Sequence, residues 1–349
     1  MSLTLLRVAV DTLETSIGGQ LFEHATLLLE DLKAAALSSG TPQYAPLAGL
    51  DFAVQAYGSK PFRYVLEGEL ARIRLSPVAN VPGASIRLSA LGLALYEPLP
   101  LHDLVSAVVA DYFGPGAPPK LSRIDVAADF QGLDLADLGR ARFVSPATYR
   151  PIFPSVERPE TYYFGKAPLQ VRIYNKTQEL QKSGKFWMRQ LWAQHPDYDP
   201  ELDVWRFEIE VRREVLRKLR YHTPNQAVED SAAILRHGLT RQASLRIPKG
   251  QSSDRWRLHP AWESLIEANG NHTTLTRDKA DQSLTSLSRI VPVVAGYAIS
   301  AGAVRHIRDF ETVWALLGDR VRKHLGSEEA FGEMVRLRRL ERLGKGGSA

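Results

Sequence analysis

Apolar and polar side chains alternate along three segments near the middle of this chain, residues 123–130, 169–176 and 206–212. An alternation with a period of two places one set of side chains on each face of a β-strand, so each segment predicts a half-buried strand. The polar faces carry Asp125, Asp129, Gln170, Arg172, Tyr174, Lys176, Arg206, Glu208, Glu210 and Arg212. If the three strands share one sheet, these side chains converge.

Shorter patterns predict the remaining elements. Apolar stripes predict helices over residues 12–38, 101–112, 214–219 and 225–237, and β-rich runs predict strands near 50–56, 63–70 and 86–91. The last third lacks strand periodicity, and residues 310–317 and 328–343 predict amphipathic helices. We therefore expect an α+β protein in which a central antiparallel β-sheet is flanked by helices and followed by a helical C-terminal region. The expected divisions are an α+β region at 1–115, a core at 116–220 and a basic, mainly helical region at 221–349.

A tyrosine beside carboxylates on neighbouring strands can cut a phosphodiester covalently. A phenol is a weak nucleophile at neutral pH because its ordinary pKa is ~10. Carboxylates can hold a hard divalent cation that offsets charge on the phosphate. Attack by Tyr174 would leave a phosphotyrosine and a free 3′-hydroxyl, and Lys176 on the same face could pair with the phosphate. The alternative is a packed aromatic residue beside a solvated ion-pair ladder.

Four blocks of the chain, residues 122–130, 161–165, 171–179 and 205–213, resemble in order, spacing and residue type the successive blocks of the rolling-circle replication initiation factors. That family includes plasmid initiators, replication proteins of filamentous phages and related conjugative nickases. The resemblance is sharp from Leu121 to Val215 and weaker at residues 84–92. One departure lies between Gly165 and Val171, where family members often carry a serine or an arginine-serine pair and this chain reads Lys-Ala-Pro-Leu-Gln.

The resemblance implies roles for particular residues. Tyr174 falls on the active tyrosine of the family, and Asp125 and Glu208 fall on its metal-binding carboxylates, with Glu210 as a third ligand or a supporting group. Asp129 stays open as a further ligand. The implied cofactor is Mg²⁺ or Mn²⁺. The implied activity is a single-strand nick at a replication origin, in which Tyr174 forms a 5′-phosphotyrosyl intermediate and the 3′-hydroxyl primes synthesis.

Two motifs that are missing from the sequence narrow this prediction. None of the nine histidines stands two residues from another, so a metal site built on a histidine pair is disfavoured and oxygen ligands are preferred. The chain has no Gly-x-x-x-x-Gly-Lys-Ser/Thr run, so we expect no ATPase, and strand separation would need a partner helicase.

The distribution of charge favours nucleic acid as a partner. The formal net charge is +5, and residues 1–120, with 8 Lys and Arg against 11 Asp and Glu, contribute −3, so the remainder carries +8. Candidate DNA contacts are Arg172, Arg206, Arg212 and Arg213, and a second basic run lies at residues 336–345. The alternative is a solvated helix face.

The same reasoning predicts the partners and the compartment. Origin DNA would be recognised as a duplex and cut as a single strand, and the plasmid members of the family act as dimers. The absence of cysteine is compatible with a reducing cytoplasm. The apolar run at residues 290–304 is too short to span a bilayer, and no signal peptide is recognisable, so no membrane is expected. A conjugative relaxase with the same chemistry, a catalytically inactive DNA-binding regulator, and a metal nuclease that uses water are the alternative functions.

Overall fold

The computed structural model describes residues 3–47, 50–113, 118–154, 159–270, 298, 301–302, 305–328 and 330–332. The chain divides into two compact units, Met1–Arg277 and Asp278–Ala349. The strands are β1 Thr4–Ile17, β2 Gln43–Leu47, β3 Leu50–Val54, β4 Tyr64–Glu67, β5 Ala71–Leu75, β6 Ala84–Leu88, β7 Lys120–Gln131, β8 Phe143–Val144, β9 Ile152–Pro154, β10 Pro159–Lys166, β11 Leu169–Asn175, β12 Trp205–Arg212 and β13 Ser244–Leu245.

The helices of the first unit are α1 Glu23–Ser39, α2 Ala90–Leu95, α3 Pro98–Ala110, α4 Leu135–Leu138, α5 Lys176–Ser183, α6 Met188–Trp192, α7 Arg213–Lys218, α8 Pro224–Glu229, α9 Ser231–His237 and α10 Pro260–Ala268. Single turns lie at Arg140–Arg142, Gly238–Gln242 and Ser253–Arg255. The second unit contains α12, Phe310–Leu325.

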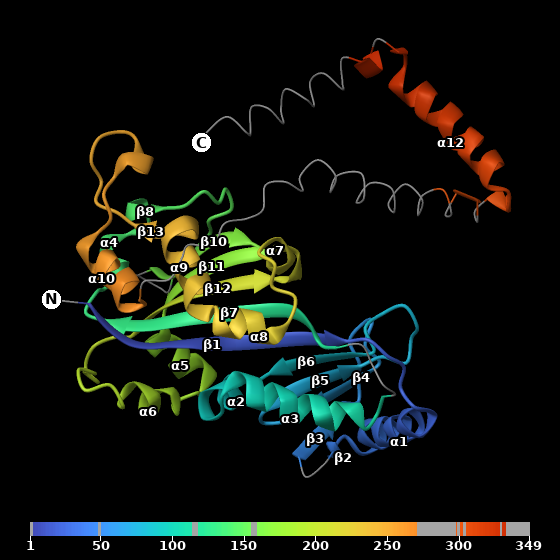
Figure 1. The fold of residues 1–349 in the computed structure, drawn as a ribbon, viewed down its shortest axis with the longest axis horizontal. Coiled ribbons are helices and arrows are strands. Elements are labelled where there is room, and N and C mark those ends of the chain that lie inside the picture. Colours follow the sequence, from blue (N-terminus) through green and yellow to red (C-terminus); the bar gives the residue numbers. More distant parts are fainter. Residues whose placement is uncertain are drawn as a thin grey trace. The chain divides into compact units, whose positions relative to one another are not determined.

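Eleven strands of the first unit form one sheet in the order β2-β3-β4-β5-β6-β1-β7-β12-β11-β10-β9 (Figure 1). Every neighbouring pair in it is antiparallel. β8 and β13 pair separately. The predicted α+β class with a central antiparallel sheet is confirmed, and the three strands predicted to share a sheet are neighbours in it.

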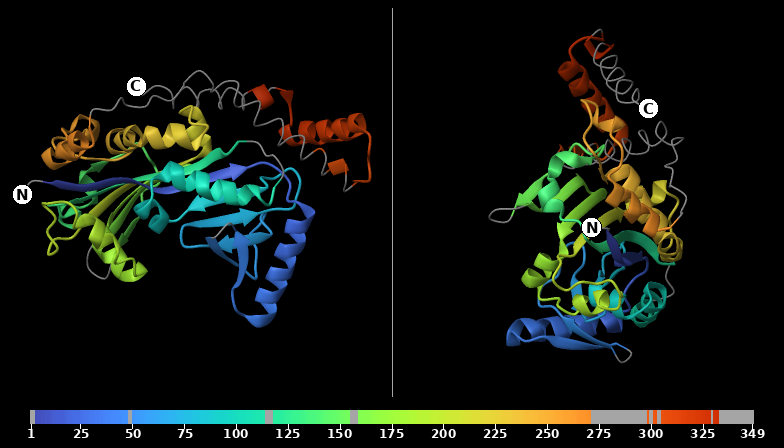
Figure 2. Two further views of the ribbon diagram at one scale, coloured as in Figure 1. Left: turned by 60° about the horizontal axis from the view of Figure 1, so that its bottom comes forward. Right: turned by 90° about the vertical axis from the view of Figure 1, so that its left-hand side faces the viewer.

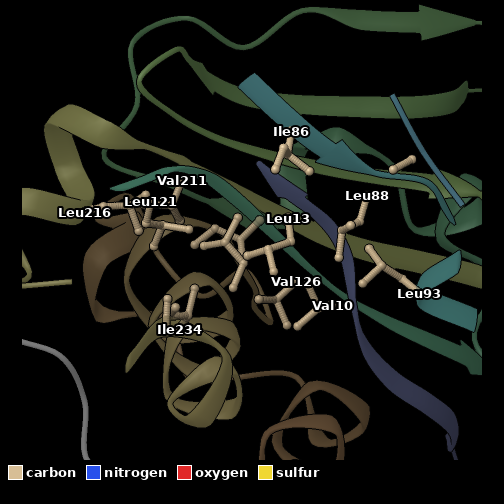
Figure 3. Packing of buried hydrophobic residues seen from close by; sticks show 14 of the residues in the cluster. Val10, Leu13, Ile86, Leu88, Leu93, Leu121, Val126, Val211, Leu216 and Ile234 are labelled. Atoms are coloured by element: carbon tan, nitrogen blue, oxygen red, sulfur yellow. The ribbon is translucent and has the colours of Figure 1, made fainter. Parts of the chain in front are cut away.

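The two faces of the central strands are covered differently. One face carries the apolar residues of β7, and α8, α9 and α10 lie over it, whereas α5 and α6 lie against the other face (Figure 2). Figure 3 shows residues of one buried cluster, among them Val10, Val126 and Val211 of three strands, Leu216 of α7 and Ile234 of α9. The polar set of side chains therefore lies on the face that α5 and α6 cover only in part.

β1 corrects one prediction. The helix predicted over residues 12–38 is wrong for its first part, because β1 continues to Ile17 and α1 begins only at Glu23. β1 pairs with β7 along most of its length, and β-branched residues favour that extended backbone. Its register is shifted at three places, one of them between Val10 and Thr12. Such a β-bulge interrupts the alternation on which a sequence-based assignment depends.

The sheet has a narrow joint where β1 meets β6. β1 pairs with β7 from Thr4 to Ser16, but it pairs with β6 only from Glu14, opposite Arg87, to Ile17, opposite Ala84. These four residue pairs connect β2–β6 to the strands that carry the predicted site.

A buried ion group ties three strands together on the polar face. Arg206 of β12 donates from Nε to Asp129 Oδ1 of β7 at 2.6 Å and from Nη1 to Asp11 Oδ1 of β1 at 2.6 Å. Trp192 of α6 donates from Nε1 to the other oxygen of Asp129 at 2.9 Å. The guanidinium and the Asp129 carboxylate are both buried, so the pair is compensated inside the protein. The bulge at residue 11 supplies the second carboxylate.

In the second unit, α12 includes the helix predicted at residues 310–317 and extends beyond it. Asp309 Oδ2 accepts from the backbone N of Thr312 at 2.8 Å and caps the helix. Of the helix predicted at 328–343, residues 328 and 330–332 are helical, and the rest, with the basic run at 336–345, lies outside the described residues. No helix within the described ranges is long and apolar enough to cross a bilayer.

Arg206→Met would leave Asp129 buried without its cation, and we expect the free energy of unfolding to fall by about 3–5 kcal/mol. Urea denaturation followed by circular dichroism measures the loss. The matched control is Arg212→Met, which removes an exposed guanidinium on the same strand and should cost less than about 1 kcal/mol. Equal losses in the two variants would contradict the role of the buried ion group.

Candidate active site

Neighbouring strands bring Tyr174 and the predicted carboxylates onto one face. β12 lies between β7 and β11, and its register places Glu208 opposite Arg172 and Arg206 opposite Tyr174. On its other side, Glu210 lies opposite Asp125. These pairs share a face because each strand alternates, so the local period of two is sufficient to assemble the cluster.

The phenol of Tyr174 points at a carboxylate. Its Oη donates a hydrogen bond to Glu208 Oε2 at 3.0 Å, and the side chain is half-buried. Burial and the negative charge of Glu208 raise the pKa of Tyr174 well above its ordinary value. The phenol is therefore protonated at neutral pH, and it lies within reach of a group that can accept its proton.

Three carboxylates lie close together beside the phenol. Burial raises the pKa of Asp125 to about 7, with Arg123 opposing the rise and the charges of Glu208 and Glu210 adding to it. Glu208 and Glu210 are also buried. Mutual repulsion in a buried place makes this cluster unstable unless cations neutralise it.

Arginines supply that neutralisation in this structure. Arg123 donates from Nε to Asp125 Oδ1 at 2.8 Å, and its Nη2 lies 2.8 Å from Glu210 Oε2. Arg172 pairs with Glu208, and its Nη2 lies 3.6 Å from Asp125 Oδ2. The two guanidiniums thus bridge all three carboxylates.

As arranged, the carboxylates do not fit a metal ion. Their oxygens are held by guanidiniums, and no three Asp, Glu, His or Cys side chains gather as a metal-binding group anywhere in the described part of the chain. Oxygen ligands are the chemistry that Mg²⁺ and Mn²⁺ prefer, so the donor types agree with the prediction while their arrangement does not. Asp129, considered as a further ligand, is taken up by Arg206 and Trp192.

Lys176 lies beside Tyr174, but the strand predicted over residues 169–176 does not include it, because β11 ends at Asn175. It is the first residue of α5, it is buried, and it pairs with Glu179. Its Nζ lies 5.5 Å from the centroid of the Tyr174 ring. Burial and the nearby charge of Arg206 lower the pKa of Lys176. The ammonium therefore contacts the ring of the predicted nucleophile.

Asn175 fixes the end of β11 directly after Tyr174. Its Oδ1 accepts from the backbone N of Gln178 at 3.0 Å and caps α5, and its Nδ2 donates to Asp203 Oδ2 at 2.6 Å. The predicted tyrosine therefore stands on a strand whose end is anchored by a helix cap.

The predicted DNA-binding arginines separate into two groups. Arg172 and Arg212 lie on the polar face, half-buried and exposed respectively. Arg206 is buried in its ion group, and Arg213 begins α7 and donates from Nη1 to the backbone O of Leu121 at 2.8 Å. Three of the four therefore share the face that carries Tyr174, but Arg206 is buried there, so only Arg172 and Arg212 are accessible on it.

Two residues of the site were missed in the sequence. Arg123 stands two residues before Asp125 on the same strand, so the alternation could have placed it in the cluster. The sequence gives no signal for Asp11, because its position depends on the bulge in β1, next to residues whose pattern predicts a helix.

No protein-family model matches the chain, and no curated protein matches it. Among solved structures, the chain is similar to one described as "Structure of Rolling Circle Replication Initiator Protein from Geobacillus stearothermophilus". The similarity covers 77% of this chain and 97% of that chain, with a TM-score of 0.44 and 17% sequence identity.

Proposed function

We propose that this chain is a DNA-nicking enzyme that initiates rolling-circle replication with Tyr174 as its nucleophile. The observation that carries the proposal is the hydrogen bond from Tyr174 Oη to Glu208 Oε2 at 3.0 Å, on a face that also holds Asp125 and Glu210. A buried phenol needs a base in order to attack, and here it has one in contact. The resemblance of the sequence blocks supports the same assignment.

The proposed step balances as a transesterification. Tyr174 Oη attacks phosphorus, its proton passes to Glu208, and the bond between phosphorus and the 3′ oxygen breaks. The leaving oxygen takes up a proton and becomes a 3′-hydroxyl, while the 5′ phosphate stays on the tyrosine. No oxidant or nucleotide is consumed, and the reverse reaction closes the strand.

Arg172 is the positioning group that this chain offers to the phosphate. It is half-buried and pairs with Glu208 directly beside the phenol. A planar guanidinium suits a phosphate because it can donate two parallel hydrogen bonds. Negative charge that develops on the phosphate oxygens would be stabilised by this fixed cation.

Mg²⁺ or Mn²⁺ is the proposed cofactor, and Asp125, Glu208 and Glu210 are its proposed ligands once Arg123 and Arg172 release them. When bound, the cation would polarise the scissile phosphate. Origin DNA, a helicase and a second copy of the chain are the proposed partners. The same chemistry would serve a conjugative relaxase.

A DNA-binding regulator without catalysis is the second candidate. It is favoured by the observation that arginines already neutralise the three carboxylates, since such a network resembles a structural ion-pair cluster. Covalent chemistry separates the two candidates.

Tyr174→Phe removes the nucleophile while keeping the ring against Lys176, so we expect no covalent protein–DNA product from this variant. The measurement uses an end-labelled single strand from upstream of the gene, with Mn²⁺ or with EDTA, and detects a denaturant-resistant adduct. Wild-type protein should form the adduct only with Mn²⁺.

The possible results of this measurement separate the candidates. Cleavage without an adduct would identify water as the nucleophile. Binding of the origin strand with neither cleavage nor adduct would favour the regulator and contradict the nickase.

Glu208→Gln keeps the shape of the side chain but removes the proton acceptor, so we expect the rate of adduct formation to fall by ~10²–10⁴-fold. Single-turnover kinetics with the same strand measure it. Glu210→Gln is the comparison variant, because Glu210 is a proposed metal ligand but no hydrogen bond joins it to Tyr174 among the described contacts, so it shows the effect of losing a ligand without losing the proton acceptor. An equal loss in both variants would assign Glu208 to metal or charge balance instead of proton transfer.

A further inference from the structure

We propose that an arginine-lined pocket beside the candidate active site binds backbone phosphates of the DNA strand that reaches Tyr174. The proposal rests on the proposed nicking function, because that function implies that the ligand is single-stranded DNA. The pocket has a volume of about 300 Å³, and five guanidiniums line it, those of Arg72, Arg74, Arg87, Arg123 and Arg212. Its other lining residues are Glu14 and Ser122.

The register of the sheet explains why these arginines meet. Arg72 of β5 lies opposite Arg87 of β6, which lies opposite Glu14 of β1. Glu14 lies opposite Arg123 of β7, which lies opposite Arg212 of β12. Residues directly opposite each other in antiparallel strands share a face, so one row crosses five strands. The row runs across the narrow joint between β6 and β1.

Carboxylates hold several of these guanidiniums in place. Arg74 pairs with Glu14 and donates from Nη2 to Ser85 Oγ at 2.8 Å. Arg72 pairs with Glu67, and Arg212 donates from Nε to Glu210 Oε1 at 2.6 Å. Both Arg72 and Arg212 are about half exposed, at 52% and 49% of the side chain. Their remaining N–H groups are therefore available for an anion without losing these supports.

The side chain of Arg87, which is unpaired within the described residues, is the strongest indication that the pocket binds a ligand. It is half-buried and lines the pocket, yet its side chain has no hydrogen bond or ion pair with any residue that the structure describes. Five guanidiniums line the pocket against one carboxylate, Glu14, which pairs with Arg74, so the excess of positive charge around Arg87 favours an anion. Arginine forks match the geometry of phosphate oxygens.

The lining residues favour a strand over a free nucleotide. Arginine, glutamate and serine form the pocket, and no aromatic or apolar side chain among the described lining residues offers a surface for a base. The pocket therefore suits contacts with phosphate that do not depend on sequence.

The pocket and the candidate active site are continuous. Arg123 lines the pocket and also binds Asp125 and Glu210. Arg212 lies six residues along β12 from Arg206, the residue opposite Tyr174, which corresponds to ~20 Å at the rise of a strand. A strand lying along this face would contact the pocket while another of its phosphates reaches the phenol.

The test measures binding without cleavage, in the Tyr174→Phe background with EDTA, so that it does not depend on the nicking activity. A fluorescein-labelled 30-nucleotide oligothymidylate is titrated by anisotropy at several NaCl concentrations. We expect Arg87→Ala to weaken binding several-fold and to reduce the slope of log K against log salt by ~0.7. Arg72→Ala with Arg87→Ala should reduce it by ~1.4.

Two control variants make the result specific. Arg87→Lys keeps the charge and should restore most of the slope. Arg241→Ala removes an exposed arginine of the turn Gly238–Gln242, which packs on the opposite face of the sheet, and should leave affinity and slope unchanged. Because Arg87 has no described side-chain partner, Arg87→Ala should melt at the temperature of the parent protein.

Unchanged affinity and slope in both alanine variants would overturn the proposal. A loss of affinity for duplex DNA without a loss for oligothymidylate would also overturn it. So would displacement of the labelled strand by ATP when unlabelled oligothymidylate with the same concentration of phosphate groups does not displace it. A missing Tyr174 adduct would overturn the nicking function but not this binding result, so the two failures are distinguishable.

Discussion

Burial of Arg206 is the constraint on which the polar face depends. A guanidinium removed from water requires compensating carboxylates, and it takes one from β7 and one from the bulged part of β1. That requirement fixes three strands in one register, and it places Tyr174 beside Glu208 because β11 pairs with the same strand. The hydrophobic face could be assembled from many residues of similar size. The ion group admits far fewer substitutions, since each partner must match the others in charge and position.

In the candidate site, close to the buried ion group of Arg206, two arginines neutralise three carboxylates. Asp125, Glu208 and Glu210 would repel one another if Arg123 and Arg172 did not lie between them. Arg123 also lines the pocket that we propose for backbone phosphates, and Arg172 is the group that we propose to position the scissile phosphate. If the proposed function holds, a strand of DNA and the carboxylates would compete for these two cations, and the balance between them would decide whether the carboxylates are available to other ligands.

The sequence could predict the features that depend on alternation within a strand, but not those that depend on residues far apart in the chain. Tyr174, Glu208 and Asp125 were placed on one face by local alternation, which is visible in a few residues of each strand. The bulges in β1 break that alternation, so the sequence predicts a helix where the second part of β1 lies, and it does not place Asp11 in the site. The burial of Arg206 depends on Asp11 of β1, which lies 195 residues away in the sequence. Arg72 and Arg87 belong to a region of net negative charge, and only the strand order brings them to the others.

The narrow pairing of β1 with β6 has a mechanical consequence. Four residue pairs join two half-sheets of five and six strands, so far fewer hydrogen bonds resist a change of twist there than along the eleven residue pairs of β1 with β7. Arg87 stands on one side of this joint and Arg212 on the other. A polyanion bound by both arginines would link the two half-sheets across the joint. Occupancy of the pocket would then stiffen the molecule, and the angle between the half-sheets would report whether a strand is bound.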